Sequence, residues 1–320
     1  MTTTLDRCQG CGGLVDVEDL FCPNCGREVP DRRRLENPQL ALGVKNFGCK
    51  NCGASMVYDA AARSLKCPFC GSMDLEEDGS KGILAPEIVL PFRIDQAGAE
   101  GRLRAWLGSS FWHPNDLRSA AQLTDLKAVF VPFWVFAAKV RTHWAADSNR
   151  PPSGAYGQWY PISGDREGSY DDLWVPASEG LKSAELLAVA PFDEKTGVPP
   201  AEAGLEGVAV EQFAISRRYA RPMVQEQLES RETAAVIVQM GGSLRNVHVN
   251  TLARDETSKA ALAPVYVMAY RYHKHLYRFV LNGQTGKASG SAPTSWVKVA
   301  GLILLIATLI GVGVALIARQ

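Results

Sequence analysis

The chain has 320 residues, 46% of them hydrophobic, and 34 Lys and Arg residues balance 34 Asp and Glu residues to a net charge of zero. This length allows one large domain or several small ones. The balanced charge argues against a protein that holds nucleic acid by broad electrostatic attraction, because such affinity rests on neutralising phosphates.

All eight cysteines lie in the first 70 residues, where they form four Cys-x2-Cys pairs, each followed by glycine. Such a turn places two thiolates side by side, and two facing turns make a tetrahedral site of four sulfurs that suits Zn²⁺. The spacing predicts two zinc ribbons, each with one structural zinc ion. Ribbon 1 (residues 1–30) has the ligands Cys8, Cys11, Cys22 and Cys25, and ribbon 2 (residues 44–80) has Cys49, Cys52, Cys67 and Cys70.

The N-terminal stretch MTTTLDRCQG has no apolar run of the kind found in a secretion signal, so we expect reduced thiolates rather than disulfides. Rubredoxin-like iron binding uses the same turns and stays an alternative, although the short distance between the paired turns favours zinc. Residues 31–43 form a linker with a basic run, Arg32–Arg34. Ribbon 1 carries more acidic than basic residues, which favours a protein partner over nucleic acid.

Residues 81–295 are expected to form an α+β body with antiparallel hairpins. Helical periodicity predicts helices over Gln96–Leu107 and Ser216–Met240, and Pro, Gly and Ser residues indicate a loop over 148–170. Runs of aromatic and β-branched residues predict strands at Ala128–Val140, Val247–Thr251, Ala263–Tyr272 and Leu276–Leu281.

The segment 296–320 contains an uncharged run, Val299–Ala318, long enough as a helix to span a bilayer. It predicts a single C-terminal transmembrane helix, and so a tail-anchored protein of the cytoplasmic membrane with its N-terminal bulk in the cytoplasm. Small residues at every fourth position, Ala307, Gly311 and Ala315, favour self-association of this helix.

Residues 282–287 (NGQTGK) look like part of a phosphate-binding loop. A Walker A loop would need glycine and Ser or Thr where Leu281 and Ala288 stand, so a hairpin turn is the better interpretation. The histidines His273 and His275 and the acidic pairs at 171–172 and 193–194 do not form a recognisable catalytic pattern. We therefore expect a protein that is not an enzyme and binds no cofactor except zinc.

Three stretches carry a family resemblance: VLPFRIDQAGAEGRLRAWL (89–107), LKAVFVPFWVFAAKV (126–140) and LAPVYVMAYRYHKHLYRFVLNGQTGKASGSAP (262–293). With the ribbons, they resemble a bacterial family of transcription-factor-IIB-type zinc-ribbon membrane proteins, often labelled primosomal protein N′ or superfamily II helicases. The resemblance implies a membrane-associated role alongside band-7-type or phage-shock-type proteins in envelope stress, and it implies no catalytic residues.

The function predicted from these features is a tail-anchored adaptor that docks cytosolic proteins at the inner face of the membrane. The alternative is a membrane-tethered nucleic-acid-binding protein that uses ribbon 2 and Arg32–Arg34.

Overall fold

The computed structural model describes residues 6–12, 14–15, 44–59, 66–77, 86–108, 110, 112–117, 122–123, 126–150, 157–205, 207–241, 243–273 and 275–317. Its centre is an 11-stranded sheet in the order β13-β12-β11-β8-β10-β4-β3-β5, with β9 paired to β8 and with β6 and β7 paired to β11. Nearly all of these pairs are antiparallel. The exceptions are the pairs β10–β8 and β11–β6, which are parallel.

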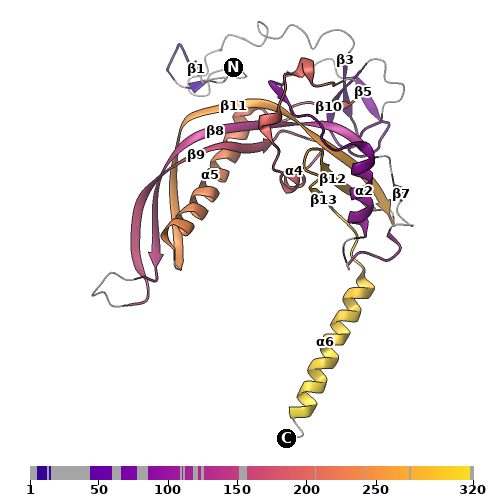
Figure 1. Ribbon diagram of the computed structural model, residues 1–320, viewed down its shortest axis with the longest axis vertical. Helices are drawn as coiled ribbons and strands as arrows, with labels where there is room; N and C mark the ends of the chain where they lie inside the picture. The colour runs from indigo at the N-terminus through magenta and orange to yellow at the C-terminus, as the bar shows by residue number, and fades with distance from the viewer. Residues whose placement is uncertain are drawn as a thin grey trace.

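Three long strands dominate the sheet: β8 (Lys127–Ser148), β9 (Tyr160–Pro176) and β11 (Leu244–Tyr272). Their upper halves lie in the core, and their lower halves bend away together as a three-stranded arm (Figure 1). In the arm, β8 alternates buried and exposed side chains from Ala138 to Ala146, so one face is covered and the other meets solvent.

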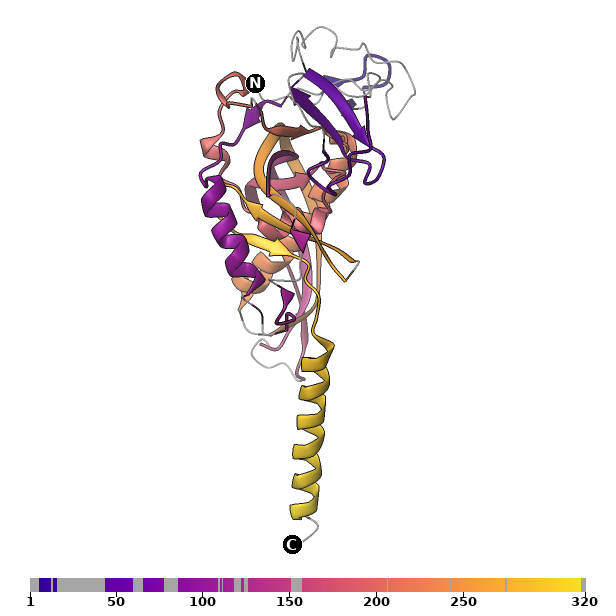
Figure 2. The ribbon, with the colours of Figure 1, turned by 90° about the vertical axis from the view of Figure 1, so that its right-hand side faces the viewer.

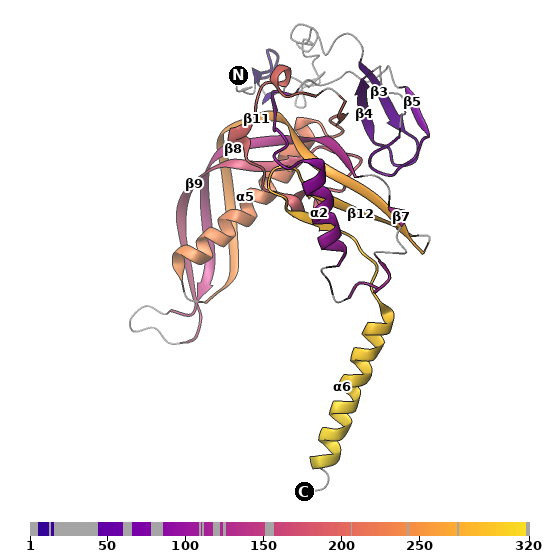
Figure 3. The same ribbon diagram turned by 45° about the vertical axis from the view of Figure 1, so that its right-hand side comes forward.

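Helix α5 (Arg217–Met240) covers the inner face of the arm (Figures 1 and 3). Ala220, Val224 and Leu228 recur at every fourth position and pack against the β8 residues Trp134 and Phe136. The helix ends at Gly241, whose φ of 59° lies in the left-handed region that glycine adopts without strain.

The other side of the body is built on β11, β12 (His275–Asn282) and β13 (Ala288–Gly290), beneath α2 (Gln96–Leu107). Helix α2 starts where the Asp95 carboxylate accepts the Gly98 N–H at 2.9 Å. Its buried face, Ala99, Leu103 and Leu107, packs against Tyr266 and neighbouring β11 and β12 side chains. Short elements complete the chain: β6 (Ile88–Val89), β7 (Gln122–Leu123), α4 (Ser183–Val189), η1 (Glu194–Thr196), η2 (Pro200–Glu202) and β10 (Ala209–Glu211).

Residues 282–287 (NGQTGK) form a turn whose buried residues Asn282 and Gln284 hold the segment 189–196. Asn282 Nδ2 donates to the carbonyls of Val189 at 2.9 Å and Pro191 at 3.0 Å. Its Oδ1 accepts the N–H groups of Gln284 and Thr285. Gln284 in turn accepts the Asp193 N–H and donates to Thr196 Oγ1, each at 2.9 Å. The polar groups of this turn are thus engaged within the protein, as the hairpin interpretation implies.

Ribbon 2 contributes β3 (Val44–Cys49), β4 (Ser55–Asp59) and β5 (Leu75–Glu77) to the main sheet. Strand β10 makes the join: it pairs antiparallel with β4, with Glu211 opposite Met56, and parallel with β8, with Val210 opposite Phe130. Ribbon 2 therefore continues the sheet of the body at one corner (Figure 3). In ribbon 1, β1 (Asp6–Arg7) and β2 (Leu14–Val15) pair with each other.

Helix α6 (Trp296–Ile317) projects away from the body (Figure 2). At its base the Ser295 N–H donates to the Trp112 carbonyl and Lys298 Nζ donates to the His113 carbonyl, each at 2.8 Å. Across the residues that the structure describes, none of the helices combines the length and the apolar character that a membrane crossing requires.

The predicted membrane anchor over 296–320 is therefore wrong, and with it the tail-anchored, single-pass placement in the cytoplasmic membrane. Lys298 lies in the first turn of α6, where its ammonium group donates to the His113 carbonyl of the body. The fold is a mixed, sheet-rich body with helices α2, α4, α5 and α6 in its described part.

The loop expected over 148–170 is also corrected, because β9 begins at Tyr160. The sequence from Tyr160 to Tyr170 alternates strictly between half-buried and exposed positions, as one strand of a sheet with one covered face does. The alternation is not visible in the sequence, because glycines occupy two of the covered positions. Gly164 lies under the Trp144 ring, where a Cβ would come within 2.8 Å of Cζ2, and Gly168 lies beside Glu232.

Candidate metal centre

Ribbon 2 forms two Cys-x2-Cys turns of the same geometry. In each turn the glycine after the second cysteine donates its N–H to the carbonyl of the first: Gly53 to Cys49 at 2.8 Å and Gly71 to Cys67 at 2.9 Å. Both glycines have positive φ, 80° and 75°. A residue with a Cβ adopts this conformation with strain, which explains the glycine after each pair.

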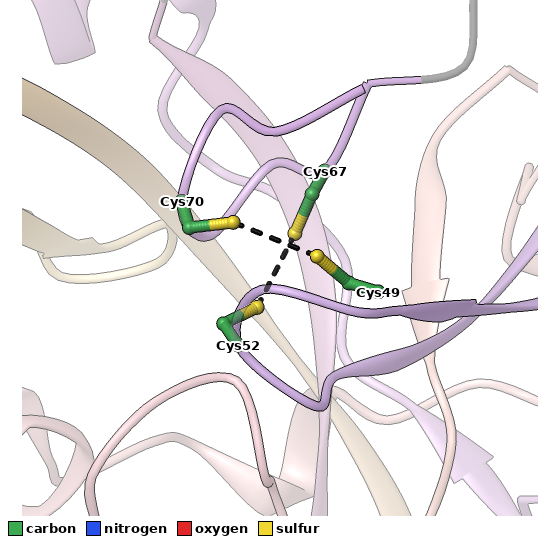
Figure 4. Close-up of side chains that lie close together, drawn as sticks. All are labelled: Cys49, Cys52, Cys67 and Cys70. Carbon is green, nitrogen blue, oxygen red and sulfur yellow. Dashed lines mark hydrogen bonds between the residues drawn. The ribbon is translucent and has the colours of Figure 1, made fainter. Parts of the chain in front are cut away.

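The two turns face each other and bring four sulfurs together (Figure 4). Cys49 Sγ lies 3.6 Å from Cys70 Sγ, and Cys52 Sγ lies 3.5 Å from Cys67 Sγ. All four sulfurs lie within 4.8 Å of one another. A tetrahedron with Zn–S bonds of about 2.3 Å has edges of about 3.8 Å. The four thiols therefore form a cluster that could hold a metal ion without large rearrangement.

The thiols influence one another's protonation. The hydrogen bond with Cys67 lowers the pKa of Cys52 to about 5, whereas the same contact and then burial raise the pKa of Cys67. Burial also raises the pKa of Cys49. Such a site holds one thiolate readily and resists accumulating several negative charges. A bound dication would supply the compensating charge and release the remaining protons.

The cluster lies at the edge of the main hydrophobic core. Cys49 and Cys67 are buried in one cluster with Phe133, Val135 and Leu186 of the body. Phe69, which lies between Cys67 and Cys70 in the sequence, is fully buried, and its ring packs on Gly180, where a Cβ would approach the ring within 2.6 Å. The two Cys-x2-Cys turns thus form one wall of the core that they share with β8.

Glu211 is a buried carboxylic acid next to this wall. Its Oε1 accepts the N–H groups of Glu179 at 2.9 Å and Gly180 at 2.7 Å. Its second oxygen, Oε2, is buried without a hydrogen-bond partner among the described residues. Burial raises the pKa of Glu211 to about 7, with a smaller contribution from the Cys52 thiolate. No sequence pattern marks this residue, because a single glutamate in a strand of three residues has no periodicity.

We expect the stability of the protein to fall as the pH rises from about 5 to about 7. A carboxyl group whose pKa is raised by folding stabilises the fold fully below its unfolded pKa of 4.5, and this contribution is lost as the pH passes about 7. The loss is on the order of 2 to 3 kcal/mol. Urea midpoints at pH 5 and pH 7.5 should differ less in Glu211→Gln than in the parent. The exposed neighbour variant Glu179→Gln should keep the parent's difference, and equal differences in all three proteins would contradict this account.

Ribbon 1 is described only in part. Its first turn repeats the geometry of ribbon 2: Gly12 has a φ of 73° and donates its N–H to the Cys8 carbonyl at 2.8 Å. The Gly10 N–H also points at Cys8 Sγ, 3.3 Å away. Cys22 and Cys25, the other two predicted ligands, lie outside the described residues. The second zinc site remains a prediction.

The histidines and acidic pairs considered as site candidates in the sequence lie in a turn or in ion pairs of the body. His273 lies in the turn between β11 and β12, and His275 is the first residue of β12. Asp193 pairs with Arg93 at 3.3 Å, and Glu194 pairs with Lys259 at 2.6 Å. Asp172 pairs with Arg231 on α5. These acids stabilise contacts between elements of the body.

Comparison with known proteins identifies a similar protein but no family to which the chain belongs. No family model matches the chain, and no solved structure matches it. The chain is similar to a protein of Bacillus subtilis (strain 168) described as "Uncharacterized protein YdjG", with 27% identity over 80% of this chain and 92% of the relative. The similarity spans most of both chains, and the relative's description assigns no activity.

Proposed function

We propose that this protein is an adaptor without catalytic activity, stabilised by zinc, whose body holds other proteins. The observation that carries the proposal is the position of the cysteine cluster of ribbon 2 in the wall of the main core. Four thiolates fill the coordination shell of Zn²⁺ and leave no position for water or a substrate. A metal held in this way supports the fold and does not take part in a reaction.

Zinc is the proposed metal for both ribbons. The all-thiolate ligand set and the tetrahedral arrangement of the sulfurs suit Zn²⁺ or iron. The short spacing of the paired turns in the sequence favours zinc, and the matching turn at Cys8 supports a second site of the same kind in ribbon 1.

The charges of the described surface favour a protein over a nucleic acid as the binding partner. On the solvent-exposed face of the arm, Lys139 pairs with Asp255 at 2.9 Å and Arg245 pairs with Asp147 at 3.3 Å. In ribbon 2, Lys50 pairs with Glu76 at 3.1 Å. Bases that are already neutralised by neighbouring acids attract phosphates weakly. The basic run Arg32–Arg34 lies outside the described residues.

Band-7-type and phage-shock-type proteins remain proposed partners on the family resemblance alone. Self-association through Ala307 and Gly311 of α6 is a second proposal, supported by the exposure of the apolar side chains around them. The third residue of that stripe, Ala315, has no described side chain.

The test is metal analysis and cross-linking of the full-length chain in its native host. We expect about two zinc ions per chain, together with cross-links from the arm to specific proteins. Loss of zinc from Cys49→Ser should reduce those cross-links. A chain that holds no zinc, or one that holds iron in its place, would contradict the proposed metal. Turnover of a substrate by the zinc-loaded chain would contradict the proposed adaptor function.

A further inference from the structure

The two Cys-x2-Cys turns of ribbon 2 meet solvent to different degrees. In the first turn, Cys52 is half-buried and stands between the exposed residues Asn51 and Gly53. In the second turn, Cys67 is buried and Phe69 is fully buried. A small molecule in solution therefore meets the first turn, whereas the second turn lies on the side of the core.

Each half-buried thiol of the cluster has a buried thiol beside it. Cys52 and Cys70 are half-buried, whereas Cys49 and Cys67 are buried. Cys52 Sγ lies 3.5 Å from Cys67 Sγ, and Cys70 Sγ lies 3.6 Å from Cys49 Sγ. Both contacts cross from one turn to the other (Figure 4). A disulfide bond of about 2.05 Å would require the two sulfurs of such a pair to approach by roughly 1.5 Å.

The second turn is held in place by the body. The Phe69 ring packs on Gly180, where a Cβ would come within 2.6 Å of the ring. Cys67 belongs to the same hydrophobic cluster as Leu181 and Leu186. Because the core fixes this turn, the Cys67 thiol stays beside Cys52 when Cys52 reacts with a molecule from solution.

We propose that ribbon 2 is a peroxide-responsive thiol site, in which Cys52 is attacked first and Cys67 completes a disulfide with it. A solvent-accessible sulfur beside a second thiol is the arrangement that turns a first oxidation into a disulfide. The inference rests on the proposed zinc site and adds a mode of regulation to it.

Hydrogen peroxide is the only co-reactant that this chemistry needs. The Cys52 thiolate attacks one peroxide oxygen, so that an S–O bond forms, the O–O bond breaks and a hydroxide ion leaves. The Cys67 thiolate then attacks the Cys52 sulfur, so that the S–S bond forms, the S–O bond breaks and a second hydroxide ion leaves. Two electrons pass from the sulfurs to the peroxide. The disulfide no longer supplies thiolate ligands, and the metal is released.

A disulfide across the turns would replace the metal as the link between them. A bond between Cys52 and Cys67 ties the first turn to the second, which the core holds. A second bond between Cys49 and Cys70 would repeat this link. Oxidation should therefore release zinc and leave the wall of the core closed, whereas a chelator acting on the reduced chain should open it.

A disulfide within the first turn, between Cys49 and Cys52, is the competing product. It would leave the first turn without a link to the second, so that loss of the metal would open the wall of the core. Trypsin separates the two products, because it cuts ribbon 2 into three cysteine peptides: residues 46–50 with Cys49, 51–63 with Cys52, and 67–81 with Cys67 and Cys70.

The first test treats the zinc-loaded full-length protein with hydrogen peroxide, alkylates the remaining thiols and maps the disulfides by mass spectrometry. We expect peptide 51–63 to be linked to peptide 67–81 through Cys67, with zinc released to a chromogenic chelator. A link between peptides 46–50 and 51–63 would overturn the proposal, and so would retention of all the zinc.

The second test identifies the thiol that reacts first. With less peroxide than protein and a cyclic diketone that traps sulfenic acids, the adduct should form on Cys52 at least tenfold more than on Cys70. Cys67→Ser should increase the adduct on Cys52, whereas the matched variant Cys70→Ser should still form the Cys52–Cys67 disulfide. Equal labelling of Cys52 and Cys70 in the parent protein would overturn the proposal without recourse to either variant.

The third test compares amide hydrogen exchange in β4 and β10. The oxidised, metal-free protein should exchange within about twofold of the zinc-bound protein, and the reduced, chelated protein should exchange faster than both. Equal exchange of the two metal-free forms would overturn the proposal. A chain purified without zinc would contradict the proposed function as well. A zinc-loaded chain that forms no Cys52–Cys67 disulfide would contradict this inference alone.

Discussion

Replacing Cys67 with serine is expected to destabilise the body as well as ribbon 2. A structural zinc ion contributes on the order of 10 kcal/mol to the fold that holds it. Cys67 is buried in the same hydrophobic cluster as Phe133 and Leu186, so loss of the metal opens a wall of the main core. Urea unfolding followed by tryptophan fluorescence should show a free energy of unfolding lower by several kcal/mol, because Trp134 and Trp174 lie in the body.

Cys8→Ser is the matched control for this prediction. Cys8 also begins a Cys-x2-Cys turn, but the described strands of ribbon 1, β1 and β2, pair only with each other. The variant should leave the unfolding of the body close to that of the parent. If Cys67→Ser were as mild as Cys8→Ser, ribbon 2 would not be part of the core, and the present account would be wrong.

Replacing Asn282 with alanine is expected to have the second largest effect. The side chain is fully buried and makes four hydrogen bonds, two to the carbonyls of Val189 and Pro191 and two from the N–H groups of Gln284 and Thr285. Alanine would leave these buried groups unpaired, at about 1 kcal/mol or more for each of the most buried ones. We expect the free energy of unfolding to fall by about 3 kcal/mol.

Thr285→Ala is the control in the same turn. Thr285 is exposed, and its hydroxyl accepts a long contact from the Lys287 N–H at 3.3 Å. This variant should change the free energy of unfolding by less than about 0.5 kcal/mol. A comparably small effect of Asn282→Ala in thermal or urea unfolding would show that the turn does not hold the segment 189–196 in place.

Most of the structure that could be predicted from the sequence followed from the spacing of the cysteines and from the periodicity of the helices. Helix α2 has the predicted bounds, Gln96–Leu107, and α5 begins one residue after the predicted start at Ser216. These features are local, because a turn or a helical stripe is set by neighbours within a few residues. The four cysteines of ribbon 2 were predicted as one cluster for the same reason, and the structure brings them together.

The pairing of strands that lie far apart in the chain could not be predicted from the sequence. The join between ribbon 2 and the body depends on β10, a strand of three residues with no pattern of its own, which pairs with both β4 and β8. The sequence predicts a loop where β9 begins, because glycines occupy the covered face of this strand and Trp144 and Glu232 fill the space above them. The apolar run at the C-terminus was interpreted by length and composition alone, and the described part of α6 does not bear out the membrane anchor.

Hydrogen exchange of the full-length protein, with zinc bound and after its removal by a chelator, tests the central claim most directly. The claim is that the metal site of ribbon 2 and the body form one cooperative core joined through β10. We predict that zinc removal increases exchange together in β4, in β10 and in the upper half of β8, around Val129 and Phe130. Increased exchange confined to residues 44–77, with β8 as protected as before, would contradict the account.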